Sequence, residues 1–349
     1  MAERIVGLDI GRDRIRAVEI ENPRKARPTV VRAQEIVLPD GAVRSGEVRE
    51  LHTVASALRR LWSSGGFKSK DVVLGMGNQR VLARDLTVPK MPIDDIRASL
   101  PFQVQDLLPV PVADAILDFY PISSGMGDNG PVVHGLLIAA IKEAVNANVQ
   151  AVRMAGLRPA EVDLIPFALT RLMAGSANGE VIVLVDIGGT TTNVVVSVRG
   201  VPEFVRIIPT GGDDITKAIS SRLGINAIAA ENLKRSSRLG RAGVLPEERQ
   251  AAEVLSEASY ELLNSLRNTI NYYVNAHPQN RPARIVMTGG GSLLGGLTDA
   301  LSEMTHTPVA LGNPFEHVTV ARALTKGKGN TPEPVALSVA LGLAMGSAA

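Results

Sequence analysis

The sequence contains no cysteine, which excludes disulfide bonds, thiol catalysis and zinc sites built on cysteine. Its five histidines are scattered without metal-ligand spacing, at His52, His134, His277, His306 and His317. The longest apolar run, residues 335–345, is shorter than the about 20 residues that a membrane-spanning helix needs. A strand pattern begins within a few residues of Met1, so we expect no signal peptide. We therefore expect a soluble, cytoplasmic protein.

The charge has no strong excess of either sign. The formal net charge is +2 and the basic residues form no stripe, so nucleic-acid binding gains no support. Hydrophobic content of 45% and charged content of 21% are typical of globular proteins. A length of 349 residues favours two domains, each able to bury its own core.

The tripeptide Asp-Ile-Gly occurs twice, at residues 9–11 and 186–188, so the offset is 186 − 9 = 177. Each copy follows an apolar run and precedes small or polar residues, after which β-branched sequence returns. This pattern predicts a strand, a tight turn and a strand in each half. Asp9 and Asp186 would each end a buried strand, where an ionised carboxylate is costly without a cation or donors. Two of them facing one cleft suit a hydrated Mg²⁺; alternatively, each Asp only stabilises its own turn.

Glycine-rich segments follow several predicted strands. Residues 188–192, Gly-Gly-Thr-Thr-Thr, are a stronger phosphate-loop candidate than residues 11–14, Gly-Arg-Asp-Arg, because glycines and hydroxyls form an anion nest. Arg12 and Arg14 either reach phosphate or point into solvent, and we expect solvent for at least one. Residues 210–214 either offer a helix N-terminus to a nucleotide or are a plain cap.

Three consecutive glycines, residues 289–291, follow another predicted strand and indicate close approach of a large group such as a purine, or else a flexible turn. Glu231 and Lys234 stand three apart on a predicted helix and can face one way.

The remaining pattern is a repeat with an insertion. Strands are predicted at 5–8, 15–20 and 29–38, and again at 181–186, 192–198 and 203–208. Residues 93–107 keep helical spacing, with Pro101 expected to kink or break the helix. Residues 166–174 are expected to be helical, residues 213–276 mainly so, and residues 89–164 form a small α+β insertion.

Taken in order, these motifs resemble the actin/Hsp70/sugar-kinase ATPase superfamily. The two phosphate motifs would be residues 6–20 and 184–198, the connecting helices 165–175 and 335–346, and the adenosine motif 286–297. Within the superfamily the chain is most similar to the FtsA-like branch, and there to the PilM family of type IV pilus assembly proteins. Residues 107–119, 155–169 and 231–235 carry this narrower resemblance.

The resemblance implies an α/β fold with duplicated actin-like (ribonuclease H-like) domains around a nucleotide cleft. Subdomain 1A would comprise residues 1–88, 165–180 and 335–349, and an inserted FtsA-type subdomain 1C residues 89–164. Subdomain 2A would comprise 181–212 and 285–334, and helical subdomain 2B residues 213–284.

The implied ligands are ATP and Mg²⁺. Asp9 and Asp186 would hold the metal through waters, and Asp186 could also position a water. Around the phosphates the resemblance places Gly11, Arg12, Gly188, Gly189, Thr190, Thr191, Gly211 and Gly212. Glu231 and Lys234 would touch the ribose or the adenine edge, and Gly289, Gly290, Gly291 and Ser292 would flank the base.

Two departures from the family pattern concern chemistry. Arg12, Asp13 and Arg14 stand where the family has small or hydroxyl residues. Filament-forming relatives place a glutamate before the proline of the first connecting helix, whereas Ile165 precedes Pro166 here. Because an aliphatic side chain cannot orient or deprotonate water, we expect ATP binding with slow hydrolysis or none.

The implied partner is the cytoplasmic N-terminal tail of a PilN-like inner-membrane protein, bound in a groove between subdomains 1A and 1C. The membrane would be reached only through this partner. Two alternatives are a sugar or acid kinase, for which no catalytic-base segment is visible, and an FtsA-like polymerising protein, for which we see no amphipathic anchor after residues 335–345. The sequence leaves filament formation open.

Overall fold

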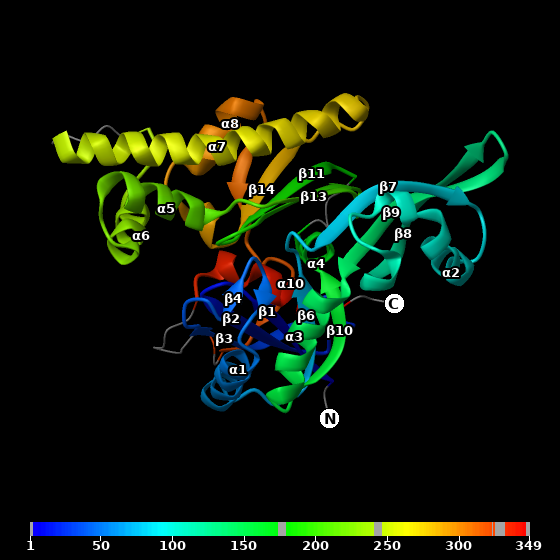
Figure 1. The fold of residues 1–349 in the computed structure, drawn as a ribbon, viewed down its shortest axis with the longest axis horizontal. Helices are drawn as coiled ribbons and strands as arrows, with labels where there is room; N and C mark the ends of the chain where they lie inside the picture. The colour runs from blue at the N-terminus through cyan, green and yellow to red at the C-terminus, as the bar shows by residue number, and fades with distance from the viewer. Residues whose placement is uncertain (1–2, 174–178, 241–245, 323, 325–331, 347–349) are drawn as a thin grey trace.

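A computed structural model describes residues 3–173, 179–240, 246–322, 324 and 332–346. It consists of two halves, each built on a mixed β-sheet, with a helix pair between the sheets (Figure 1). This pair is α4 (Ile165–Met173) and α10 (Ser338–Ala344). The short helix η4 (Pro334–Leu337) leads into α10. Residues 174–175 of the expected connecting helix lie outside the described residues.

The sheet of the first half has six strands in the order β10-β6-β1-β2-β3-β16. Their bounds are β1 (Arg4–Ile10), β2 (Arg14–Glu21), β3 (Thr29–Val37), β6 (Asp71–Met76), β10 (Arg158–Leu164) and β16 (Thr319–Val320). Strands β1, β2 and β3 pair antiparallel, whereas β6 and β10 continue from β1 in parallel. A separate small ribbon joins β4 (Val43–Arg44) to β5 (Glu47–Val48).

The sheet of the second half repeats this topology, with the order β13-β12-β11-β14-β15. Its strands are β11 (Val181–Ile187), β12 (Thr192–Val198), β13 (Val201–Ile208), β14 (Arg284–Thr288) and β15 (Val309–Leu311). Again three strands pair antiparallel and two follow in parallel. The repeat confirms the expected duplicated actin-like fold.

Helices cover the outer faces of both sheets. On the first half they are α1 (Leu51–Gly65) and α3 (Lys142–Met154), which share a core with β1, β2 and β6. On the second half α5 (Gly212–Leu223), α7 (Pro246–Ala276) and α8 (Leu297–Thr305) enclose another core, and α6 (Ala227–Ser236) packs on α5. The 31-residue α7 runs along the second half, near the top of Figure 1.

Glycines allow close packing of the central helix pair. A Cβ on Gly7 of β1 would lie 1.8 Å from the carbonyl oxygen of Ala340 in α10. A Cβ on Gly342 would lie 2.4 Å from the carbonyl oxygen of Ala168 in α4. Helix α4 in turn contacts β11, β12 and β13, so the pair links the two sheets through a shared core.

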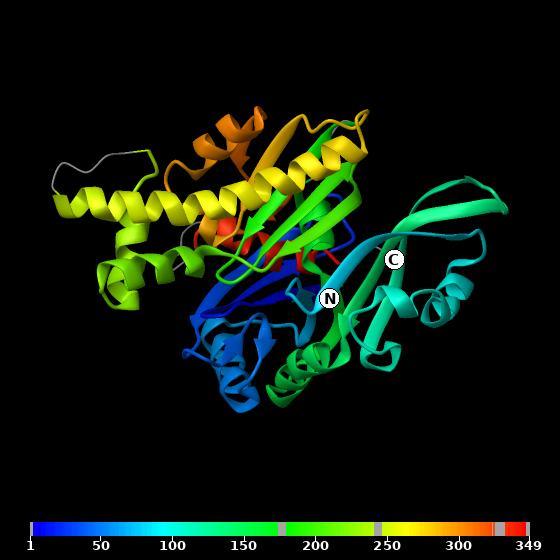
Figure 2. The ribbon, with the colours of Figure 1, turned by 45° about the horizontal axis from the view of Figure 1, so that its top comes forward.

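An insert in the first half has its own three-stranded sheet, ordered β7-β9-β8 (Figure 2). Its elements are β7 (Val81–Pro89), α2 (Ile93–Gln103), η1 (Gln105–Leu107), η2 (Val112–Asp114), β8 (Ala115–Gly127) and β9 (Gly130–Ile141). Pro101 lies within the last turn of α2, so the expected break comes only after Gln103. Strand β7 also packs against β13 of the second half.

The sheets draw the boundaries of this insert differently from the expected 89–164. Strand β7, which begins at Val81, pairs with β9 of the insert, whereas α3 and β10 pack on the first half. Strand β16, expected in subdomain 2A, joins the first sheet beside β3. The sequence pattern carries no information on which sheet takes an edge strand.

Candidate functional site

Two equivalent β-hairpins face each other between the halves. In the first, β1 and β2 pair Asp9 with Arg16, and in the second, β11 and β12 pair Asp186 with Asn193. Each turn is closed by the same hydrogen bond, from Gly11 N to Arg14 O and from Gly188 N to Thr191 O, both 2.9 Å. Every one of these positions recurs at the same offset of 177 residues, as in 188 − 11 and 193 − 16.

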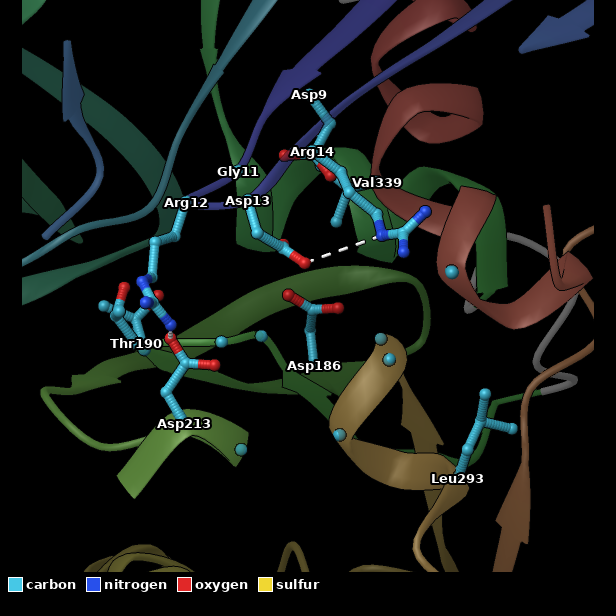
Figure 3. Close-up of a pocket in the computed structure, with 18 of the residues that line it drawn as sticks. Asp9, Gly11, Arg12, Asp13, Arg14, Asp186, Thr190, Asp213, Leu293 and Val339 are labelled. Carbon is cyan, nitrogen blue, oxygen red and sulfur yellow. Dashed lines mark hydrogen bonds and ion pairs between the residues drawn. The ribbon is translucent and has the colours of Figure 1, made fainter. Parts of the chain in front are cut away.

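The hairpins line a cleft with a cavity volume of about 810 Å³ (Figure 3). This volume lies within the roughly 300–1,000 Å³ usual for small-molecule sites. Most of the residues expected at the site line it: Asp9, Gly11, Arg12, Asp186, Gly188, Gly189, Thr190, Thr191, Gly212, Glu231, Lys234, Gly289, Gly290 and Gly291. Gly211 and Ser292 do not. Ser292 is buried and donates instead to Gly289 O at 2.7 Å.

The two aspartates differ in their neighbours. Asp186 is only 5% exposed, and burial, reinforced by the negative charge of Asp9, raises its pKa to about 7. Burial also raises the pKa of Asp9, but Arg16, 3.7 Å away, opposes that shift. The cleft therefore holds two desolvated carboxylates, of which Asp186 has the weaker cationic support.

Asn193, which the sequence analysis did not single out, completes this part of the cleft. Its side chain is buried, and Oδ1 accepts no hydrogen bond within the described part of the chain. A metal-bound water could donate to this oxygen. The pair Asp9 and Asp186 together with Asn193 thus fits a hydrated Mg²⁺, which keeps several waters and bridges phosphate oxygens. The 177-residue offset from Arg16 was the signal that could have found Asn193.

The second hairpin is tied to the N-terminus of α5. Gly212 N donates to Gly188 O at 2.9 Å, and Asp213 N donates to Gly189 O at 2.8 Å. A Cβ on Gly211 would lie 2.5 Å from Gly189 O, so this glycine is needed for the contact between loop and helix. The sequence left open whether residues 210–214 face a nucleotide or only cap a helix. The structure places Gly212 and Asp213 in the cleft wall while α5 is capped.

Lys234 is held by three acceptors. Its ammonium donates to Gly212 O at 2.9 Å and Thr216 Oγ1 at 2.8 Å, and it lies 2.7 Å from a carboxylate oxygen of Glu231. Burial acts to raise the pKa of Glu231, but hydrogen bonds from Lys234, Thr216 and Arg235 lower it to about 2. Lys234 therefore fixes the positions of Glu231 and of the start of α5. Of these two side chains, the Glu231 carboxylate is the one that keeps lone pairs to accept a hydrogen bond from a ribose hydroxyl.

The three glycines after β14 have separate roles. Gly289 has φ +81°, and a Cβ there would lie 2.5 Å from Ile187 O; a Cβ on Gly291 would lie 2.3 Å from the Ile187 side chain. These two glycines are required by packing against β11. A Cβ on Gly290 would meet nothing within 4 Å, so of the three glycines only this one has room for a side chain.

Two exposed apolar side chains also stand in the cleft wall. Ile228 of α6 is 76% exposed, and Leu293 of the short helix η3 (Gly290–Leu293) is 45% exposed. Apolar surface of this kind, beside Glu231 and Gly290, is suited to the faces of a planar base.

The expectation that Arg12 or Arg14 points into solvent is wrong. Arg12 is ion-paired with Asp213 and Asp40, and Arg14 with Glu35 and Asp13. The sequence could not reveal these partners, since Asp213 lies in the other half of the chain. Ile165 also lines the cleft, at the start of α4.

In the part of the chain that the structure describes, no helix is long and apolar enough to cross a bilayer.

The fold and the cleft define the class of protein, which is that of the actin-like ATPase superfamily. The MreB5 protein of Spiroplasma citri bound to ADP shares the fold, with a TM-score of 0.53 and 12% identity over 97% of this chain and 94% of that one.

The chain belongs to the family of type IV pilus assembly proteins PilM, whose family model matches residues 7–348. The solved PilM-PilN type IV pilus biogenesis complex contains a similar chain, with a TM-score of 0.83 and 27% identity, covering 98% of this chain and 97% of that one. The cell division protein FtsA of Neisseria meningitidis is 24% identical over 266 residues, 64% of each protein. This likeness places the family in the FtsA-like branch, while the match spans less than two thirds of the FtsA chain.

Proposed function

We propose that this protein is a cytoplasmic, ATP-binding scaffold of the type IV pilus inner-membrane assembly complex. In this role ATP and Mg²⁺ brace the two halves, and the braced molecule binds the N-terminal tail of a PilN-like membrane protein. The observation that carries the proposal is the duplicated hairpin cleft, with desolvated Asp186 beside the unpartnered Oδ1 of Asn193, in a chain of the PilM family.

The nucleotide would lie with its phosphates between the hairpin tips. Gly11, Gly188 and Thr190 would approach the phosphates, and a bound Mg²⁺ would neutralise part of their charge. Glu231 would accept from the ribose, with the base between Ile228 and Leu293. Ser292 is excluded from this set by its burial.

Hydrolysis would be slow because the cleft wall at the start of α4 is apolar. A Cβ on Gly77 would lie 2.9 Å from Ile165, so this side chain fills the wall closely. Ile165 offers no group that could orient or deprotonate an attacking water. Nucleotide would therefore act mainly as a structural ligand: at 100 times its Kd, a ligand adds about 2.7 kcal/mol to the stability of the state that binds it.

The partner tail would bind in a groove between the insert and the rest of the first half. The insert exposes apolar residues that are available for such a contact, among them Phe102, Leu107 and Ile116. In the similar solved complex, the PilM chain is paired with PilN. An extended peptide would gain affinity from main-chain hydrogen bonds and specificity from side-chain pockets.

The test combines nucleotide retention with tail binding. The purified protein is loaded with ATP and Mg²⁺, and the bound nucleotide is followed by chromatography over hours. In parallel, a labelled tail peptide of the PilN-like protein is titrated by fluorescence anisotropy with and without nucleotide, with a scrambled peptide as control. We expect retained ATP, a higher melting temperature and tighter tail binding. Equal tail affinity without nucleotide, or turnover above about one per second, would overturn the proposal.

A further inference from the structure

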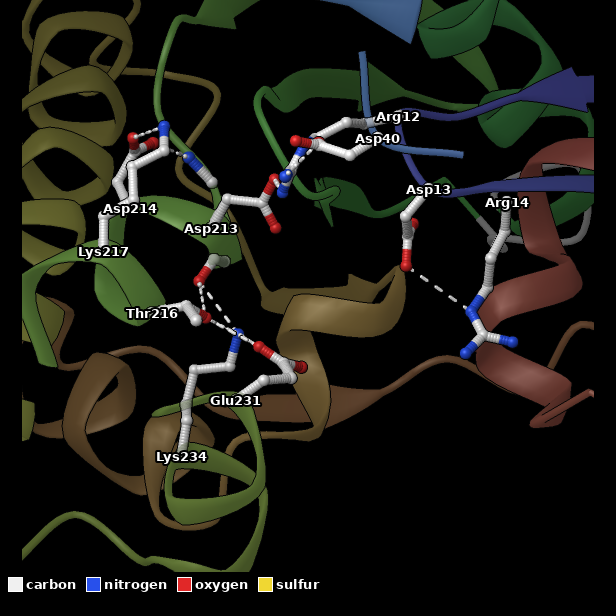
Figure 4. Close-up of polar contacts among 12 residues, drawn as sticks. Arg12, Asp13, Arg14, Asp40, Asp213, Asp214, Thr216, Lys217, Glu231 and Lys234 are labelled. Atoms are coloured by element: carbon white, nitrogen blue, oxygen red, sulfur yellow. Dashed lines mark hydrogen bonds and ion pairs between the residues drawn. The ribbon is translucent and has the colours of Figure 1, made fainter. Parts of the chain in front are cut away.

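Arg12 lies at the tip of the first hairpin and joins the two halves of the molecule (Figure 4). One nitrogen of its guanidinium donates to Asp213 of α5 in the second half. The other donates to Asp40 in the first half at 3.0 Å. The hydrogen bond and charge of Arg12 lower the pKa of the Asp40 carboxyl. Arg12 is thus a bridge with one contact in each half, on a largely buried Asp213 and on Asp40, whose side chain is 88% exposed.

Asp213 occupies an unusual place for a carboxylate. It lies in the first turn of α5, and its carboxylate oxygens are 3.3 Å from where a Cβ on Gly189 would stand. The second phosphate loop is therefore directly beneath it, and its side chain is only 19% exposed. An anion at this point opposes the arrival of phosphate, because like charges repel.

The chemistry of the guanidinium allows it to change partners. Its planar fork can donate two parallel hydrogen bonds to two phosphate oxygens. In the pair with Asp213, only one nitrogen donates, to one carboxylate oxygen. Figure 3 shows Arg12 reaching the wall of the cleft beside Thr190, between the two hairpin tips. A terminal phosphate held between these tips would come within reach of the arm that now contacts Asp213.

We propose that Arg12 is an exchangeable clasp: it pairs with Asp213 across the cleft when no nucleotide is bound, and it moves to the terminal phosphate of a bound nucleoside triphosphate. The contact with Asp40, whose side chain is 88% exposed, is not needed for this exchange. This inference rests on the proposed nucleotide binding. It makes Arg12 the residue that distinguishes a triphosphate from a diphosphate, and Asp213 the competitor that the triphosphate displaces.

The clasp predicts that substitutions of Arg12 and of Asp213 change ATP affinity in opposite directions. Arg12→Ala removes a charge-assisted contact with phosphate, so ATP binding weakens at least about tenfold, and ADP binding weakens less. Asp213→Asn removes the competitor, so ATP binding tightens, by about fivefold at most for a partly exposed ion pair. In the double variant the gain from Asp213→Asn shrinks to the part that comes from relief of repulsion alone, because the rest acts through Arg12.

The experiment is calorimetric titration of ATP and ADP, each with Mg²⁺, into the wild type, both single variants and the double variant. Arg24→Ala is the matched control, since Arg24 is 89% exposed and lies in the loop after β2, with only a 3.9 Å contact to Glu3. If Asp213→Asn tightens ATP equally in the presence and absence of Arg12, the two residues act by simple repulsion and the exchange is overturned. Unchanged ATP affinity in Arg12→Ala overturns it as well.

A second readout needs no nucleotide. The cysteine-free chain accepts spin labels at two introduced cysteines, Arg60→Cys on α1 and Asn264→Cys on α7, both exposed and on opposite halves. Arg12→Ala should broaden the distance distribution between them toward an open cleft, and an unchanged distribution overturns the cross-cleft half of the clasp. If the wild type binds no nucleotide, the proposed function fails, whereas normal ATP binding with an insensitive Arg12 overturns only this inference.

Discussion

Asp9 and Asp186 lie close enough across the cleft for the charge of one to affect the other, although 177 residues separate them. Burial first, and then the charge of Asp9, raises the pKa of Asp186 to about 7. The folded protein therefore holds a proton that the unfolded chain releases near pH 4. Two anionic groups placed in this way favour a cation between them.

Stability without ligand should consequently fall as pH rises from about 4 to 7. In this window the native state binds more protons than the unfolded state, so the free energy of unfolding decreases, by about 4 kcal/mol at most. Asp9, whose pKa is also raised, contributes with the same sign. Urea unfolding of Asp186→Asn should show a flatter pH profile than the wild type, and Mg²⁺ with ATP should flatten that of the wild type. The exposed substitution Asp128→Asn is the control; a profile for Asp186→Asn that follows the wild type would contradict the assignment.

Two adjacent glycines should separate folding from ligand binding. Gly289→Ala forces a side chain onto a residue with φ +81° and a contact of 2.5 Å with Ile187 O, so stability should fall by about 2 kcal/mol or more. Gly290→Ala places its methyl group in open space and should leave the melting temperature nearly unchanged while lowering ATP affinity. Both variants are measured by thermal unfolding and by nucleotide titration, and each serves as the control for the other. Equal loss of stability in both would show that Gly290 does not border the ligand.

Lys234→Met should lower both stability and nucleotide affinity. The substitution leaves Glu231 without its more buried cation and Gly212 O without its lysine donor, so we expect a loss of about 2–4 kcal/mol. Arg235→Ala, which removes a more exposed partner of the same carboxylate, should cost under about 1 kcal/mol. Urea denaturation measures both variants. If Lys234→Met keeps full stability but loses ATP, the lysine contacts the nucleotide directly.

Ile165→Glu should raise the rate at which the protein hydrolyses the ATP that the wild type retains. A carboxylate at the start of α4 would face the cleft and could orient a water, which typically contributes about 10²-fold or more to a rate. Phosphate release from preloaded protein measures the change. Ile165→Gln, of similar size but without a base, separates basicity from shape. A rate unchanged in Ile165→Glu would show that another feature of the cleft limits hydrolysis.

The duplicated architecture was predictable because each copy of Asp-Ile-Gly lies within a local structure. That structure consists of an apolar strand, a turn that needs glycine and a second strand. Hydrogen bonds within each hairpin fix this structure, so a short stretch of neighbouring residues carries the information. The order of the five motifs then identified the cleft and most of its lining. The family assignment followed from the same residues.

What escaped prediction depends on long-range contacts. Arg12 donates a hydrogen bond to Asp213, 201 residues away, and no local sequence pattern predicts this contact. The triple glycine suggested one purine-facing surface, but packing on Ile187 accounts for two of its members. The sheet that each edge strand joins is also set by long-range contacts: β7 pairs with β9, whereas β10 pairs with β6.

The dependence of the first half on α10 has a consequence for biosynthesis. The sheet around β1 is completed by a helix made after the whole of the second half, since α10 packs against β1, β2 and β6. The strands and helices of the second half, by contrast, come from one continuous stretch, residues 181–311. That continuous stretch still depends on the same C-terminal segment, because Gly289 N and Thr288 Oγ1 both donate to Val335 O, and Thr288 Oγ1 is also hydrogen-bonded to Ser338. During translation we therefore expect both halves to reach their final packing only after residues 335–344 have left the ribosome.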